Sequence, residues 1–206
     1  MRRIGAVLFF AAAAATAQAS IDAGLEPGVD FTTPGSEQSG ISYTLGFTFS
    51  VSTRTTVSRL GYFDAGDDGL TQSHPVGLFD VATGNLLRTA TVTNADPWGP
   101  SGSGSWFKWH PMNEGPITLL PGVTYEVAGA TGTEAYMWNP AGFANGIVNF
   151  QASYWSSSGG LSRPTSPAFG IRYVGPNIGS VPEPSVIGAI GVLGVAWLQR
   201  RRREPR

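Results

Sequence analysis

Four aspartates form the clearest cluster of side chains that could do chemistry in this sequence. Asp64, Asp67 and Asp68 fall in the short turn DAGDDG, and Asp80 follows one expected strand later. Carboxylates this close repel one another unless a hard cation or water lies between them, and calcium takes oxygen ligands of this kind. The spacing does not fit an EF-hand, because Gly66 stands where that loop needs an oxygen ligand. A calcium site and a solvated acidic turn therefore both remain open.

Tryptophan is the second feature that could bind a ligand. Five of the six tryptophans fall between positions 98 and 155. An exposed aromatic face can stack on a sugar ring, although large aromatic residues more often belong to a core. Trp98 lies between Pro97 and Gly99 in a loop-like segment. We expect Trp98 to lie outside the core, where it is the candidate for glycan stacking.

The sequence contains no motif with a catalytic mechanism. His74 and His110 are far apart, and neither belongs to an H-E-x-x-H pattern; there is also no G-x-S-x-G nucleophile elbow and no phosphate-binding loop. A glycosidase needs two carboxylates across a cleft, and the spacing of Glu114, Glu126 and Glu134 selects no pair. We therefore expect a protein that is not an enzyme, with a carbohydrate-active enzyme as the alternative.

The elements that position these residues are expected to be short antiparallel strands. Apolar and polar residues alternate in YTLGFTFSV (43–51), VNFQASY (148–154) and FGIRYV (169–174). In the second run the alternation places Phe150 and Tyr154 on one face. Gly- and Pro-rich turns separate the runs, and Pro121-Gly122 is expected to turn the chain after a strand that ends at Leu119. No amphipathic helix is found in the body of the chain. The pattern predicts an all-β protein, an antiparallel β-sandwich of jelly-roll or immunoglobulin-like type, ahead of a barrel.

Two further segments of the body are expected to lie outside the strands. Ser156 to Pro167, SSSGGLSRPTSP, is predicted to be a flexible loop, and Gly175 to Pro184 to be a linker that leaves the domain.

The amino-acid composition of the chain excludes some classes of partner and of chemistry. The two ends hold seven of the 13 basic residues and two of the 14 acidic ones, which leaves the body with 6 basic and 12 acidic residues and a net charge of −6. Nucleic-acid binding needs clustered Lys and Arg, so no nucleic acid is expected as a partner. The chain has no cysteine, which excludes disulfides, thiol nucleophiles and Cys-ligated metals.

The first 19 residues have the three parts of a secretory signal peptide. Arg2 and Arg3 precede an apolar stretch, and Ala17-Gln18-Ala19 forms an A-x-A cleavage site before Ser20. We expect residues 1–19 to form a signal-peptide helix that a signal peptidase removes, and residues 20–178 to form the β-sandwich domain of an exported protein.

The last segment, residues 179–206, is expected to direct where the protein is sent. Pro182, Glu183 and Pro184 form a stiff, extended point, and residues 185–199 carry no charge. As a helix these 15 residues span roughly 22 Å, less than the roughly 30 Å hydrocarbon core of a bilayer. Four consecutive arginines follow, at positions 200 to 203, and favour a transmembrane helix with residues 200–206 in the cytoplasm.

Together VPEPS, the glycine-rich apolar stretch and the terminal arginines resemble the PEP-CTERM sorting signal of Gram-negative bacteria. The resemblance implies that an exosortase, a membrane enzyme of transpeptidase type, recognises Pro182, Glu183 and Pro184 and cleaves near them. It implies a transient anchor in the inner membrane, followed by transfer to the cell surface or to an extracellular polysaccharide matrix.

The body resembles an uncharacterised β-sandwich domain that is often found in such proteins. The residues that carry the resemblance are LGFTFSV (45–51), VSRLGYFDAGDDGL (57–70), SHPVGLFDVATGNLL (73–87), ITLLPGVTYEVAGA (117–130) and FGIRYVGPN (169–177). The resemblance supports fold and compartment and carries no activity. The expected role is structural or adhesive, or the binding of a glycan of the exopolysaccharide or biofilm matrix, with no required cofactor.

Overall fold

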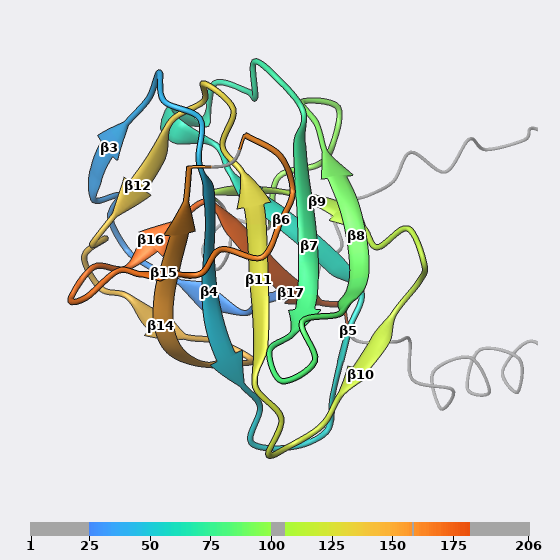
Figure 1. Cartoon of the computed structure of the whole chain (residues 1–206). Helices are drawn as coiled ribbons and strands as arrows, with labels where there is room; N and C mark the ends of the chain where they lie inside the picture. The colour runs from blue at the N-terminus through green and yellow to red at the C-terminus, as the bar shows by residue number, and fades with distance from the viewer. Residues whose placement is uncertain (1–24, 100–105, 158, 182–206) are drawn as a thin grey trace, which may run out of the picture.

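The computed structural model of the chain describes residues 25–99, 106–157 and 159–181 (Figure 1). Within these ranges the only helical element is a single 3₁₀ turn, η1 (Ala65–Asp67), and the other regular elements are strands. Every strand pairs with its neighbours in antiparallel fashion. The predicted all-β, antiparallel fold class is confirmed for the described part of the chain. The expected signal-peptide and transmembrane helices lie outside it.

The larger sheet carries most of the long strands. Within the described residues its order is β15 (Ser166–Pro167), β14 (Asn149–Ser156), β4 (Thr44–Ser50), β11 (Tyr125–Ala130), β7 (His74–Asp80) and β8 (Leu86–Val92). The turn predicted after residue 119 is confirmed, because one strand ends at Leu119 and β11 begins at Tyr125.

The second sheet lies behind the larger one in Figure 1. Its order is β1 (Glu26–Pro27), β17 (Pro176–Ser180), β6 (Arg59–Phe63) and β9 (Phe107–Pro111). Small sheets complete the fold: β16 (Tyr173–Val174), β12 (Tyr136–Trp138) and β3 (Ser36–Gln38); β10 (Ile117–Leu119) and β5 (Thr55–Val57); and β13 (Ala144–Asn145) with β2 (Val29–Asp30). Because β1 pairs with β17, the two ends of the described domain lie side by side. The linker predicted from Gly175 is wrong as far as Ser180, because Pro176–Ser180 is a largely buried strand that pairs with both β1 and β6.

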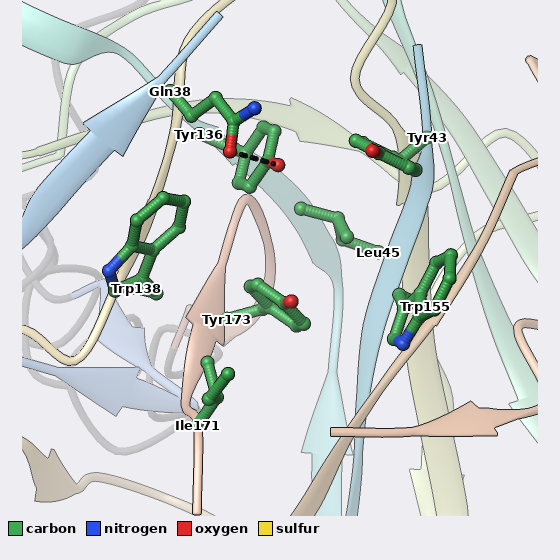
Figure 2. Close-up of a pocket in the computed structure, with 8 residues that line it drawn as sticks. All are labelled: Gln38, Tyr43, Leu45, Tyr136, Trp138, Trp155, Ile171 and Tyr173. Atoms are coloured by element: carbon green, nitrogen blue, oxygen red, sulfur yellow. Dashed lines mark hydrogen bonds between the residues drawn. The ribbon is translucent and has the colours of Figure 1, made fainter. Parts of the chain in front are cut away.

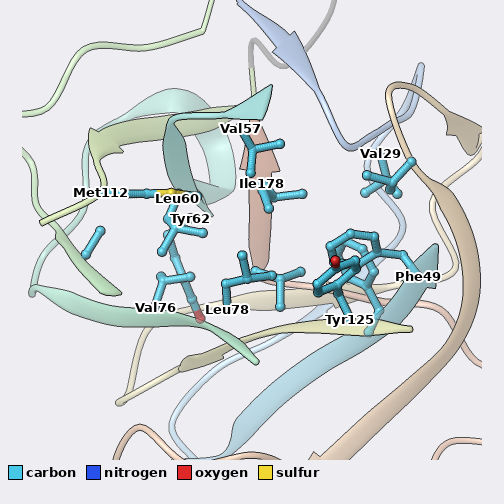
Figure 3. Close-up of a cluster of buried hydrophobic side chains, with 14 of the residues drawn as sticks. Val29, Phe49, Val57, Leu60, Tyr62, Val76, Leu78, Met112, Tyr125 and Ile178 are labelled. Atoms are coloured by element: carbon cyan, nitrogen blue, oxygen red, sulfur yellow. The ribbon is translucent and has the colours of Figure 1, made fainter. Parts of the chain in front are cut away.

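The hydrophobic core fills the space between the two large sheets (Figure 3). Phe49 and Leu78 of the larger sheet meet Leu60 and Ile178 of the second sheet, and all four side chains are fully buried. Burying a large apolar side chain contributes roughly 1.5–3 kcal/mol. The chain has no cysteine, so this core is what holds the two sheets together.

The outer face of the larger sheet is also covered. Residues 159–165, which we call the strap, cross in front of β4 and β11 (Figure 1). Thr44 Oγ1 donates a hydrogen bond of 2.7 Å to the Gly160 carbonyl. The ring of Pro164 packs against Gly46, and the side chain of Leu161 against Gly77. The loop that the sequence predicts to be flexible is therefore seated on the sheet, and β4 is buried on both faces.

The alternation predicted for VNFQASY is wrong after Phe150. The register of β14 against β4 shifts between Phe150 and Ala152, so Gln151 is an extra, bulged residue. Beyond the bulge Trp155 pairs with Leu45, and directly paired residues share a face of the sheet. The bulge thus turns Trp155 to the inner face and Tyr154 to the outer one.

The strand predicted over 169–174 is shorter than expected. Only Tyr173 and Val174 form a strand, because a turn with Gly170 at φ +70° precedes them. Phe169 is 87% exposed in this turn. Ile171 and Tyr173 still point the same way, into the site described next.

Candidate functional site

An aromatic pocket of about 260 Å³ lies between the start of β4, the end of β14 and the three-stranded sheet β16-β12-β3 (Figure 2). Its lining residues are Gln38, Tyr43, Leu45, Tyr136, Trp138, Trp155, Ile171 and Tyr173. Five of these eight carry large aromatic rings, and none carries a charge at neutral pH. We call this site the aromatic pocket.

The rings form walls and not a flat platform. Tyr43 stands nearly perpendicular both to Tyr136, at 89° with ring centroids 5.9 Å apart, and to Trp155, at 88° and 5.9 Å. Tyr173 meets Tyr136 at 73° and 6.0 Å. These edge-to-face contacts are the arrangement that aromatic quadrupoles prefer. Figure 2 shows Trp138 and Trp155 on opposite sides of the pocket.

Two features of the sequence build this site. The inward row of β4 fills the core with Phe47 and Phe49 and reaches the pocket with Leu45 and, just before the strand, Tyr43. The bulge in β14 brings Trp155 onto the same inner face. Bulges often redirect a side chain at functional sites.

The polar groups of the aromatic pocket are neutral. Burial, with smaller contributions from Tyr43 and Tyr173, raises the pKa of Tyr136 to about 12. The Tyr136 hydroxyl therefore keeps its proton and donates it to Gln38 Oε1 at 3.2 Å. The carbonyl oxygen of Gln38 accepts this hydrogen bond, and the amide N–H groups of Gln38 remain as donors for a ligand.

Trp98, the candidate for glycan stacking, lies elsewhere and is half-buried. The ammonium group of Lys108 sits 4.0 Å from the centre of the Trp98 ring, in a cation–π contact. Lys108 also donates to the Asn94 carbonyl at 3.1 Å and so fixes the loop that carries Trp98. One face of this ring is therefore already covered.

The aspartates do not gather as a calcium site would require. Asp64 is buried, whereas Asp67 at the end of η1 and Asp68 just after it are exposed. Asp80 lies at the far end of β7, whose seven residues span roughly 20 Å at about 3.3 Å each. There Asp80 accepts the backbone N–H of Thr83 and closes the β7–β8 turn. Among the described residues, no three His, Cys, Asp or Glu side chains come together to hold a metal ion.

The two histidines have structural partners. His74 is fully buried, its ring stacks on Tyr62 at 3.8 Å, and Nδ1 donates to the Ala130 carbonyl. Burial lowers the pKa of His74, so the ring is neutral. His110 Nδ1 lies 2.7 Å from Asp96 Oδ1 and joins β9 to the loop before Trp98.

The residues that the sequence predicts to direct export and sorting fall outside the described ranges. These are Ala17, Ala19 and Ser20 at the expected signal cleavage site, Pro182, Glu183 and Pro184, and the arginines Arg200, Arg201, Arg202 and Arg203. In the ranges that the structure does describe, no helix has the length and hydropathy that a membrane crossing needs.

The sequence reasoning missed the aromatic pocket. It singled out Trp98 because of its neighbours, yet Trp138 and Trp155 are the tryptophans that share a cavity. The available signal was the recurrence of aromatic residues at positions 136, 138, 155 and 173, near the ends of strands.

Comparison with known proteins places the domain in a family. No curated protein matches the chain. Residues 31–173, which hold all the lining residues of the aromatic pocket, match the family described as "Domain of unknown function (DUF4082)". The match covers more than half of the chain, and the chain therefore belongs to the DUF4082 family.

Proposed function

We propose that this is an exported, non-enzymatic protein that binds a sugar unit of an extracellular polysaccharide in its aromatic pocket. The carrying observation is a cavity with five aromatic rings and no charged lining residue. Its role at the cell envelope or in the matrix is structural or adhesive. The domain is a β-sandwich of jelly-roll or immunoglobulin-like type in this proposal, supported by the two antiparallel sheets that share one core.

Sugar binding suits the chemistry of the aromatic pocket. The faces of sugar rings carry C–H groups, which pack against the electron-rich faces of aromatic rings. The few polar groups, the Gln38 amide and the tyrosine hydroxyls, can orient the sugar hydroxyls. Sites lined mostly by aromatic side chains with a few placed polar groups are the usual form of small-molecule pockets.

The alternative, a carbohydrate-active enzyme, has less support. Glycosidases place two carboxyl groups across the scissile bond. The lining of the aromatic pocket includes neither Asp nor Glu. Glu126 is fully buried beneath the strap, which separates it from any substrate. Binding of a glycan without hydrolysis would favour a binding protein over a carbohydrate-active enzyme.

Sorting is the second part of the proposal. The C-terminal residues resemble the PEP-CTERM signal, whose Pro182, Glu183 and Pro184 an exosortase would recognise. In support, β17 is paired on both sides, with β1 and with β6, and it ends at Ser180. In the sequence, Pro182, Glu183 and Pro184 thus begin two residues after the end of the last strand.

Replacing Pro182, Glu183 and Pro184 with alanine tests the sorting. We expect uncleaved precursor to accumulate in the inner membrane while export through the signal peptide continues. Processing of the triple variant at the wild-type rate would refute it.

Binding is tested on a glycan array with the full chain. We expect retention on a subset of glycans with no release of cleaved product. An array on which nothing is retained above a matched protein without the domain would contradict glycan binding.

A further inference from the structure

We infer that the aromatic pocket takes the terminal residue of an uncharged glycan, end-on, and favours a 6-deoxyhexose whose methyl group faces Ile171. This inference rests on the proposed glycan binding and specifies the class of sugar. It follows from the size, the walls, the polar groups and the aliphatic residues of the pocket.

The size and the walls select one sugar ring over a chain. The volume of about 260 Å³ is slightly below the roughly 300–1,000 Å³ of sites for drug-sized ligands. The perpendicular rings of Tyr43 and Trp155 close adjoining sides, and Figure 2 places Trp138 across from Trp155. An extended platform for a passing polysaccharide would need rings that share a plane.

The absence of charge in the lining selects an uncharged sugar. A uronate or an ammonium sugar would lose its water without gaining a counter-ion, which costs several kcal/mol. Glu37, next to Gln38 in β3, points to the opposite side because successive side chains in a strand alternate. Arg172, between Ile171 and Tyr173, places its guanidinium 5.0 Å from the ring of Phe143 and is engaged there.

The polar groups suffice for the hydroxyls of one ring. Tyr136 donates to Gln38 Oε1, which leaves the Gln38 amide N–H groups to donate to a ligand. The hydroxyl groups of Tyr43 and Tyr173 can both donate and accept. Gln38 comes from β3, Tyr43 from just before β4 and Tyr173 from β16, and in Figure 2 Gln38 and Tyr43 lie on different sides of the pocket.

Two lining residues of the aromatic pocket are aliphatic. Leu45 is buried beneath the rings, whereas Ile171 is only half-buried and lies across the pocket from Gln38 and Tyr43 in Figure 2. A hydroxymethyl group placed against Ile171 would hold its hydroxyl against an aliphatic side chain, whereas a methyl group there would gain contact area. A hexose that carries CH₃ in place of CH₂OH at C5 therefore fits this part of the pocket better.

The test compares matched pairs of methyl glycosides with the full chain, kept soluble in a detergent that contains no sugar. The probes are the glycosides of fucose and of rhamnose, each against the hexose of the same configuration and against the corresponding uronic acid. At least one 6-deoxy sugar should bind more tightly than its hexose by about fourfold or more, the factor for one buried carbon group. The uronic acids should bind most weakly.

Saturation-transfer NMR supplies a second readout that needs no variant. The methyl protons of the bound 6-deoxy sugar should receive the strongest transfer. Equal affinity of each 6-deoxy sugar and its hexose, preferred binding of a uronate, or affinity that rises with chain length would overturn the inference while leaving glycan binding intact. Failure of every saccharide, on the array as well, would overturn both proposals.

Discussion

Arg163 Nε donates a hydrogen bond of 2.7 Å to Glu126 Oε2, and the Glu126 side chain is fully buried although it lies on the outer face of the larger sheet. Arg163 belongs to the strap and Glu126 to β11. The other carboxylate oxygen, Oε1, has no hydrogen-bond partner among the described residues. This charged pair thus holds the strap on the sheet. It also gives Glu126, the only charged side chain within β11, a partner of opposite charge.

Replacing Arg163 with methionine should destabilise the domain by roughly 2–4 kcal/mol at neutral pH, because it leaves a buried carboxylate unpaired. Chemical denaturation of the full chain measures this loss. The matched control is the double variant Glu126→Gln with Arg163→Met, which removes the charge as well and should recover part of the stability. A double variant as unstable as the sum of its single changes would speak against coupling of the two side chains.

The same pair predicts a pH dependence. Burial raises the pKa of Glu126, while the hydrogen bond and the charge of Arg163 oppose this rise. A carboxyl group whose pKa is higher in the folded state costs stability as pH rises through that pKa. The penalty of Arg163→Met, relative to the wild type, should therefore shrink as the pH falls below the raised pKa. A penalty of the same size at acidic and neutral pH would exclude this origin.

Glycines beneath the strap give a graded series of variants. A Cβ at Gly46 would lie 2.7 Å from the Val127 carbonyl oxygen, a backbone atom that cannot turn aside. A Cβ at Gly77 would meet side-chain atoms of Leu86, Phe79 and Leu161, which can move. Gly46→Ala should cost roughly 1–3 kcal/mol, and Gly77→Ala less. Thermal unfolding ranks them, with Gly160→Ala as the control, since none of the neighbouring atoms of the described residues lies within 4 Å of its Cβ position.

The buried carboxyl group of Asp64 leads us to expect a second dependence of stability on pH. Burial raises the pKa of Asp64 from 3.8 to about 6, although the Gly69 N–H and the charge of Lys108 partly offset it. The unfolded chain then gives up this proton at a lower pH than the folded one, so stability falls as pH rises from about 4 to about 6. Compared with Asp64→Asn, the wild type should lose about 2–3 kcal/mol over this range. Parallel stability curves of the two proteins would contradict the assignment.

Much of the fold could be predicted from the sequence because its information is local. Alternation in residues 43–51 correctly placed Leu45, Phe47 and Phe49 on one face. Pro121 and Gly122 marked the turn between two strands, and Gly122 adopts φ +80° there. Period-two patterns and turn residues depend only on neighbours in the chain.

The bulge and the strap could not be predicted in this way. Nothing in VNFQASY marks Gln151 as an extra residue, since the shift arises from its pairing with β4. Glycine weakens a strand, so Gly46 and Gly77 argue locally against one. In the fold, the absence of a side chain at these positions makes room for Pro164 and Leu161 of the strap. Both features depend on contacts between distant segments.

The aromatic pocket was missed for a related reason. Its lining runs from Gln38 to Tyr173 and comes from several strands. Trp98 stood out through its own neighbours, but the loop around it is fixed by Lys108 and His110 of β9. Only the pairing of β14 with β4, and of β12 with β3 and β16, assembles the site.

The most direct test of the central claim is the dissociation constant of the best glycan from the array, measured with three tryptophan variants of the full chain. Trp138→Ala and Trp155→Ala each remove a wall of the aromatic pocket and should weaken binding at least about tenfold. Trp98 lies outside the aromatic pocket, so the Trp98→Ala variant should bind like the wild type. Binding that survives in both pocket variants, or that is lost only with Trp98→Ala, would contradict the account.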